Sequence, residues 1–230
     1  MRNPVLRGGV RTWLLWIAAV SALFHGTMAS IASGSVFFIL GMVVQFWSKG
    51  CLHRNCKISQ SGPYRLVRHP FYSANLLIDT GIAVMSGFWV LVVVFPFWWT
   101  LAYLPVMRRE EAHLTARFGD AYRHYAERLP RVLPWRRPVP AGPGGFSWTN
   151  RNIIRQEIAR ALRFLSYPLM FLVILRFGNA GMEVLTAPQA ADFALAGAIA
   201  GLHLLALAWR KYAVPRMETD QLPQAGRLQH

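Results

Sequence analysis

The sequence predicts an all-α, polytopic membrane protein with about six transmembrane helices and both termini in the cytoplasm. The 230-residue chain is 54% hydrophobic and only 15% charged, whereas about 25% of the residues of a soluble domain are charged. Its apolar residues fall into runs of helix length, and its basic residues gather on the loops of one side. The formal net charge of +15 therefore indicates cytoplasmic loops beside anionic lipid headgroups and no nucleic-acid site.

Six apolar segments account for the predicted spans. The third is short and contains Asp79, and the others are close to the length that crosses a bilayer. Arginines precede the first run, as in a signal peptide, but its apolar stretch of about 18 residues is long enough to span. We therefore expect a retained first helix. The segments lie near residues 11–28, 31–48, 71–87, 88–107, 161–178 and 190–209.

The distribution of Lys and Arg orients these spans. The stretches 49–68 and 108–163 and the tail after residue 209 carry nearly all the basic residues outside the N-terminal segment. The turns at 26–31, 86–87 and 179–189 contain no Lys or Arg. Because basic loops stay in the cytoplasm, we expect the first group of loops inside and the second outside.

A Pro/Gly-rich stretch divides the chain. The sequence "PVPAGPGG" at 138–145 cannot be helical. We expect a four-span core over 1–137, a linker over 138–150, and an appendage over 151–230 that ends in a polar tail. The appendage begins with an amphipathic stretch at 151–165, which predicts a helix at the membrane interface. Its apolar face comprises Ile154, Ile158, Ala161 and Leu165.

The third span opens with an unusual polar sequence, "GPYRLVRHPFYSANLL" at 62–77. Proline is favoured at the first position of a helix, so Pro70 is expected to begin the span and His69 to cap it. The free N–H groups of residues 71–73 and the nearby arginines then favour a bound anion. The alternative is that the arginines only anchor the helix at the headgroups. The residues placed near this helix end are Tyr64, Arg65, Arg68, His69, Tyr72 and Asn75.

A second polar cluster follows the fourth span, between residues 108 and 134. Its apolar residues form one helical stripe, flanked by Glu110 and Glu111. Burial of an unpaired carboxylate is costly, so these glutamates need a cationic partner. That partner is either Arg65 or Arg68, in a structural ion pair, or a cationic ligand. The stripe comprises Leu114, Phe118, Tyr122 and Tyr125.

Together the two clusters resemble a known family. "GPYRLVRHPFY" followed by "EEAHLTARFGDAYRHYAERLPRVLP" is similar to the isoprenylcysteine carboxyl methyltransferases and the related phospholipid methyltransferases, integral-membrane enzymes that use S-adenosyl-L-methionine. The family elements match at Arg68–Tyr72, Glu110–Leu114 and Phe118–Tyr122, then at Tyr125 and at Pro130-Arg131. The resemblance covers residues 50–137 and does not extend to 141–230.

The resemblance implies a cofactor site facing the cytoplasm, and His69, Tyr72 and Glu111 as cofactor-binding residues. From position we add Tyr64, Arg65, Asn75, Glu110 and Arg131. We expect Tyr122 and Tyr125 to pack on the adenine or to face the sulfonium. Arg68 and His69 are the expected catalytic residues.

The expected acceptor is lipidic or embedded in the membrane, by resemblance an isoprenylcysteine carboxylate. A phospholipid amine, a small thiol and another lipid carboxylate stay open, and so does the oligomeric state. Two other functions remain: a sterol-type reductase that uses NADPH, which the paired glutamates disfavour by charge, and a membrane scaffold without a cofactor.

No metal is expected, because "CLHRNC" offers only Cys51, His53 and Cys56 where zinc takes four ligands. Asp79 either has a function, as intramembrane carboxylates often do, or bonds to a neighbouring helix.

Overall fold

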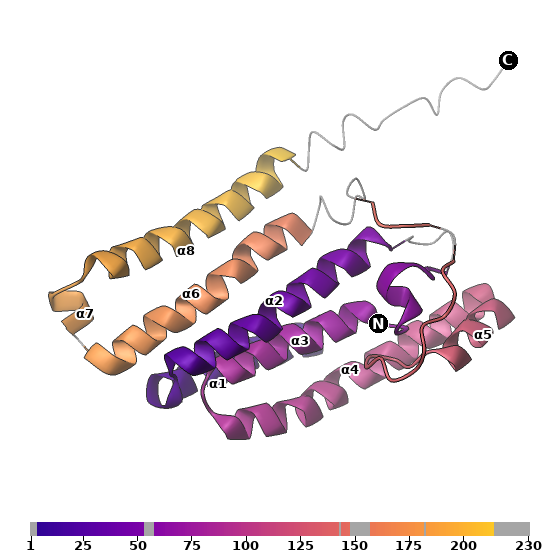
Figure 1. Cartoon of the computed structure of the whole chain (residues 1–230), viewed down its shortest axis with the longest axis horizontal. Helices are drawn as coiled ribbons and strands as arrows, with labels where there is room; N and C mark the ends of the chain where they lie inside the picture. Colours follow the sequence, from indigo (N-terminus) through magenta and orange to yellow (C-terminus); the bar gives the residue numbers. More distant parts are fainter. Residues whose placement is uncertain (1–3, 53–57, 143, 148–156, 182, 214–230) are drawn as a thin grey trace, which may run out of the picture.

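The computed structural model describes residues 4–52, 58–142, 144–147, 157–181 and 183–213. Within these residues all regular elements are helical, which confirms the all-α prediction. Figure 1 shows the long helices lying roughly side by side, with α8 at one edge and α4 at the opposite edge. The elements are α1 (Pro4–His25), α2 (Met28–Gly50), the 3-10 turn η1 (Gly62–Arg65), α3 (Pro70–Met85), α4 (Trp89–Phe118), α5 (Asp120–Arg128), α6 (Ile158–Ala180), α7 (Glu183–Thr186), α8 (Ala190–Ala208) and η3 (Trp209–Ala213).

Four helices of the described chain are long and apolar enough to cross a membrane: α2, α4, α6 and the helix that continues α8 to Lys211. Helix α3 has 16 residues and is about 24 Å long, which is shorter than a typical hydrocarbon core of about 30 Å. Its neighbours enclose it, because Ile78, Asp79 and Ile82 have no exposed surface. Six spans and cytoplasmic termini therefore remain predictions.

Glycines allow α3 to lie directly against α2. A Cβ atom on Gly34 of α2 would lie 2.6 Å from the carbonyl oxygen of Gly81 in α3, and a Cβ on Gly41 would lie 2.8 Å from the carbonyl oxygen of Ala74. Such close backbone approach is a common way for membrane helices to associate. This contact fixes the position of α3, which carries the first polar motif.

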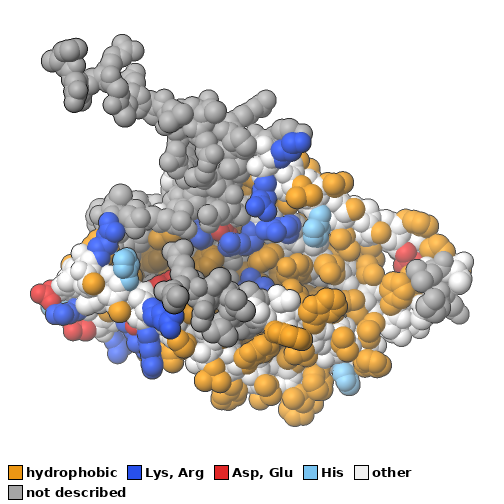
Figure 2. Space-filling view, turned by 180° about the vertical axis from the view of Figure 1, so that it is seen from behind, with side chains coloured by type: hydrophobic (Ala, Val, Ile, Leu, Met, Phe, Trp, Pro, Cys, Tyr) orange, Lys and Arg blue, Asp and Glu red, His pale blue; other side chains and the backbone are white. Residues whose placement is uncertain are grey.

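The two tight turns that the sequence predicts meet at one end of the molecule. A Cβ on Gly87, between α3 and α4, would lie within 2.0 Å of the carbonyl oxygen of His25, which ends α1. The rings of His25 and Phe88 stack with centroids 5.1 Å apart. Figure 2 shows Lys and Arg side chains gathered at the α5 end, whereas the opposite end is largely hydrophobic. Which of these ends faces the cytoplasm remains a prediction.

Helix α4 ends at Phe118, which corrects the prediction of one continuous helical stripe. Gly119 has a φ of +57°, a conformation that glycine adopts without strain, and α5 begins at the next residue. The stripe residues still meet across this turn. Tyr122, Tyr125 and Leu129 form a small buried cluster, against which Leu114 and Phe118 pack.

Helix α6 belongs to the same core as α1–α4. Residues 158–165, expected in an interfacial helix, form the first turns of α6, and residues 151–156 lie outside the described chain. Phe164, Phe171 and Leu175 of α6 join the main hydrophobic core. The division into a core, a linker and an appendage remains a prediction, but α6 covers apolar surface of the predicted core.

Topology can be tested with single cysteines in a variant that lacks Cys51 and Cys56. We expect a cysteine at Arg136 to react with an impermeant thiol reagent only after the cells are opened, because the basic loops should face the cytoplasm. A cysteine at Ala180, on the predicted outer side, is the matched control and should react in intact cells. Labelling of the Arg136 position in intact cells would contradict this orientation.

Truncation after Pro140 tests the predicted domain division. We expect the remaining chain, α1–α5, to bind the cofactor but to unfold at a lower temperature, because the core loses the packing of Phe164 and Phe171. The measurement is thermal unfolding in detergent together with cofactor affinity. A truncated chain that is folded but binds no cofactor would show that α6 or α8 contributes to the site.

Candidate functional site

Backbone hydrogen bonds hold the two sequence motifs together. The N–H groups of Arg68 and His69 donate to the carbonyl oxygens of Pro130 and Arg131, each over 2.9 Å. The hydroxyl of Ser73 donates to the carbonyl oxygen of Val132 over 2.6 Å. The segment before α3 thus pairs with the segment after α5, although about 60 residues separate them in sequence.

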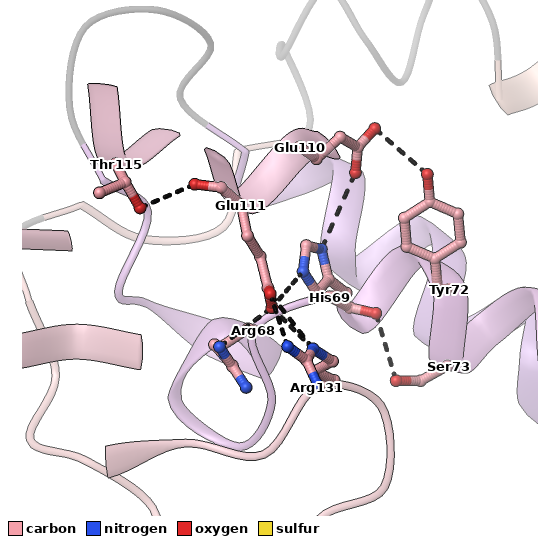
Figure 3. Close-up of polar contacts among 8 residues, drawn as sticks. All are labelled: Arg68, His69, Tyr72, Ser73, Glu110, Glu111, Thr115 and Arg131. Carbon is pink, nitrogen blue, oxygen red and sulfur yellow. Dashed lines mark hydrogen bonds and ion pairs between the residues drawn. The ribbon is translucent and has the colours of Figure 1, made fainter. Parts of the chain in front are cut away.

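The carboxylate of Glu111, near the end of α4, is the centre of the polar cluster in Figure 3. Arg68 Nη1 lies 3.0 Å from Oε1, and Arg131 donates through Nε and Nη2, with Nη2 3.0 Å from Oε2. His69 Nε2 lies 3.2 Å from Oε1. The Glu111 side chain is 12% exposed. Of the two arginines expected as structural partners, Arg68 takes this role and Arg65 does not.

These partners keep Glu111 ionised. Burial alone would raise its pKa, but the hydrogen bonds from His69 and Arg131 and the charge of Arg68 lower the pKa from 4.5 to about 2. The carboxylate therefore stays charged at neutral pH. Its negative charge holds three residues of the two sequence motifs in one arrangement.

Glu110 is more accessible than its neighbour. Its side chain is 45% exposed, and its Oε1 accepts a hydrogen bond of 3.2 Å from the hydroxyl of Tyr72. His69 Nδ1 lies 3.8 Å from Glu110 Oε2. Consecutive helix residues point about 100° apart, so one glutamate turns inward and the other keeps an exposed edge that a cationic ligand can reach.

The start of α3 follows the sequence prediction in part. His69 occupies the N-cap position and Pro70 the first helical position. However, the N–H groups of Tyr72 and Ser73 both donate to the carbonyl oxygen of His69, over 2.9 and 3.1 Å. Two of the three N–H groups expected to hold an anion therefore already have a partner, and the arginine side chains are the better anion donors.

Two buried polar atoms beside Glu111 have no hydrogen-bond partner in the described structure: Arg68 Nε and the hydroxyl of Tyr122. Burial and the charge of Glu111 raise the pKa of Tyr122 to about 12, so its hydroxyl keeps its proton at neutral pH. Buried polar groups are nearly always paired in native proteins. These two donors are therefore available to a polar ligand.

Three other predicted site residues lie outside this cluster. Arg65 Nε donates to the carbonyl oxygen of Val139 over 2.8 Å. This bond holds the segment after α5 against the 3-10 turn η1. The hydroxyl of Tyr125 donates to the carbonyl oxygen of Tyr64 over 2.8 Å, and burial raises the pKa of Tyr125. Tyr64, Arg65 and Tyr125 thus support the loops around the site.

Asn75 belongs to a different cluster, deeper along α3. Its Oδ1 accepts a hydrogen bond of 3.2 Å from Arg11 Nη2 in α1, and Arg11 also pairs with Asp79. Sequence reasoning missed Arg11. The available signal was Asp79 itself, because a carboxylate inside a membrane needs a cationic partner, and Arg11 lies at the edge of the first apolar run.

No group of three or more potential metal ligands occurs among the described residues. Cys51 is buried, and burial raises the pKa of its thiol. His53 and Cys56, the other members of the "CLHRNC" stretch, lie outside the described residues.

The ion pairs of Glu111 should make the stability of the folded protein depend on pH in the acid range. The folded-state pKa of Glu111 lies below its unfolded value of 4.5, so its contribution to stability is present above that unfolded value and is lost as the pH falls towards 2. We expect Glu111→Gln to destabilise the protein by about 3 kcal/mol at pH 7, because it leaves the largely buried guanidinium group of Arg68 without its partner. Acid should then destabilise this variant less than the parent.

Glu110→Gln is the matched control, because the Glu110 side chain is nearly half-exposed and the ion pairs with Arg68 and Arg131 belong to Glu111. We expect little change in its unfolding temperature. The measurement is thermal unfolding in detergent at pH 7 and pH 3. Equal effects of the two substitutions would contradict a special role of Glu111 in stability.

The sequence is similar to a known family and to several known proteins. The model of the phospholipid methyltransferase family matches residues 15–121. The cobalt-zinc-cadmium resistance protein CzcN of Cupriavidus metallidurans is 29% identical over 130 residues, 56% of this chain and 58% of the relative. The nickel-cobalt-cadmium resistance protein NccN of Alcaligenes xylosoxydans is 30% identical over 81 residues, 35% of this chain and 38% of the relative.

Methanethiol S-methyltransferase 1 of Bradyrhizobium diazoefficiens is 35% identical over 77 residues, which are 33% of this chain and 26% of the relative. The chain thus spans less than two thirds of the length of each of these relatives. No solved structure matches the chain. The matched region contains the Arg68–Tyr72 and Glu110–Leu114 elements, and over residues 15–121 the chain is similar to the phospholipid methyltransferase family.

Proposed function

We propose that this protein transfers a methyl group from S-adenosyl-L-methionine to a lipidic or membrane-embedded acceptor. The observation that carries the proposal is the Glu110–Glu111 cluster, which joins the R-H-P-x-Y and E-E elements at the end of a membrane helix and leaves two buried donors without partners. The family match over residues 15–121 supports methyl transfer.

The free polar atoms fit this cofactor. Arg68 Nε and the hydroxyl of Tyr122 are donors suited to its carboxylate or its ribose oxygens. Glu110, with its exposed edge beside Tyr72, is suited to the ammonium group. S-adenosyl-L-methionine supplies an electrophilic methyl group on a sulfonium ion. Tyr72 and Glu110 together offer an aromatic face and a negative charge to a cation.

The residues around this site then act mainly by position. Methyl transfer requires the nucleophile to be held in line with the methyl group, and correct placement lowers the barrier substantially. Glu111 fixes Arg68, His69 and Arg131 in one arrangement. A carboxylate acceptor needs no base. An amine or thiol acceptor must lose a proton to a base, and His69 and the exposed Glu110, whose nearest atoms lie 3.8 Å apart, are the candidate residues.

Two acceptors have specific support. The motif resemblance favours an isoprenylcysteine carboxylate, delivered from the bilayer. The similarity to methanethiol S-methyltransferase 1 favours a thiol. The family match over residues 15–121 favours a methyltransferase over the NADPH-dependent reductase.

Cofactor binding tests the proposed function. We expect S-adenosyl-L-methionine or its demethylated product to raise the unfolding temperature of the detergent-solubilised protein, and NADPH to leave it unchanged. Glu110→Gln should weaken cofactor binding about 10- to 100-fold, the effect of one lost charge-assisted hydrogen bond, without changing the cofactor-free unfolding temperature.

The other outcomes are informative. A shift with NADPH alone would indicate the reductase, and no shift with either cofactor would indicate a scaffold. Lipid extracts from cells with and without the gene, compared for a mass gain of one methylene group, would then identify the acceptor.

A further inference from the structure

An apolar groove lies between α2 and α6, which run side by side (Figure 1). Its volume is about 540 Å³, within the range of about 300–1,000 Å³ that is usual for ligand sites. The residues that line it are hydrophobic: five residues of α2 from Ile39 to Trp47, together with Phe146 and Leu165 of α6. Ile39 and Val43 are more than half exposed, so the groove is open on one side.

The segment after the Pro/Gly-rich stretch closes one end of this groove. The N–H group of Ser147 donates to the carbonyl oxygen of Gly50 over 3.2 Å, and a Cβ atom on Gly50 would lie 2.2 Å from Cε2 of Phe146. Because α2 and α6 are both long and apolar enough to cross a membrane, the open side of the groove is suited to acyl chains. The closed end, where α2 ends, is then suited to a lipid head.

Charged residues gather at the same end of the two helices. Lys49 Nζ of α2 and Arg160 Nη1 of α6 both pair with the carboxylate of Glu157, at 3.6 and 3.0 Å. The two cations also lie over the ring of Phe71, at 4.3 and 5.7 Å from its centroid. This charged cluster of Lys49, Glu157 and Arg160 therefore joins the ends of α2 and α6 beside the first turn of α3.

The charged cluster adjoins the groove. A small cavity of about 10 Å³ is lined by Glu157 and Arg160 and also by Met42 and Phe46, which line the groove as well. Such a cavity has room for at most one water molecule, so a larger polar group has to bind outside it. The Arg160 side chain is 29% exposed and offers a contact there.

The charged cluster carries more positive than negative charge. Among the described residues, Lys49 and Arg160 share one carboxylate, and Arg163 adds a further positive charge close to Arg160. Glu157 is 1% exposed, and charges that are mostly buried are weakly screened by salt. An anion at the exposed edge of Arg160 would balance this excess.

We propose that the groove binds one acyl chain of an anionic phospholipid and that Arg160 pairs with the phosphate of its head. Basic pockets between membrane helices are known to hold such heads, and the adjoining groove supplies the place for the chain. A zwitterionic lipid fits less well, because its own cation meets the excess positive charge of the cluster. The bound lipid touches both α2 and α6, so it holds α6 against the core. This inference is independent of methyl transfer.

Lipid binding to the full-length protein in detergent tests this inference. The probes are phosphatidylglycerol and phosphatidylcholine with the same acyl chains, and the measurements are bound lipid by native mass spectrometry and the unfolding temperature. We expect phosphatidylglycerol to bind at least about 5-fold more tightly, the effect of one basic residue near a lipid head, and to raise the unfolding temperature more. Inorganic phosphate at the same concentration should not displace the lipid.

Two variants test the charge. Arg160→Gln should bind the two lipids with similar affinity, because it removes the contact with the phosphate while Glu157 keeps Lys49 as a partner. The matched control is Arg123→Gln, which removes one positive charge from an exposed ion pair on α5. This control should keep the preference for phosphatidylglycerol.

Two further variants test the groove. Val43→Phe should weaken the binding of both lipids several-fold, because the added ring fills the place of the acyl chain. Val36→Phe is the matched control: Val36 also lies on α2 and is 58% exposed, as Val43 is, but it is not part of the groove lining. This control should bind both lipids as the parent does.

Four results would overturn the inference: equal affinity for the two lipids, a preference that survives in Arg160→Gln, equal effects of Val43→Phe and Val36→Phe, or displacement of the lipid by inorganic phosphate. The last result would indicate a site for a soluble anion. If Arg160→Gln does not fold, the comparison of the two lipids and the two valine variants still decide.

Discussion

The carboxylate of Glu111 holds the candidate site together. It attracts Arg68 and His69 from the segment before α3 and Arg131 from the segment after α5. The backbone bonds from residues 68 and 69 to residues 130 and 131 align these segments, and the carboxylate supplies the charge that makes three cationic or polar side chains converge. Without this negative charge the arginines would repel each other and the loops would lose their common anchor.

Helix α3 connects the two polar clusters. It is short and enclosed by its neighbours, and the glycines that face α2 let it lie deep in the bundle. Tyr72 therefore meets Glu110 near the helix start, while Asp79 meets Arg11 two turns farther on. A longer helix with a lipid-facing side could not carry Asp79 at this depth, because lipid offers no partner for a carboxylate.

Helix α6 brings the C-terminal half of the chain into contact with the helices that carry the polar clusters. Its residue Phe164 lies under Arg11, and at its N-terminal end Arg160 lies over the ring of Phe71, the residue before Tyr72. Glu157, buried just before α6, pairs with Lys49 of α2. The segment beyond the Pro/Gly-rich stretch thus contacts the Arg11–Asp79 cluster and the first turn of α3, although the family match ends at residue 121.

The sequence by itself determined the all-α class and the start of α3 at Pro70, because hydrophobic run length and helix-start chemistry are local. Only the tertiary structure decided which charges meet. Arg11 and Asp79 are 68 residues apart, so no local pattern links them. Packing also sets the rotation of each helix, and so the face that it turns towards its neighbours. This rotation decides why Glu111 is enclosed and Glu110 is exposed. It also decides why Arg65 and Asn75 lie outside the Glu111 cluster.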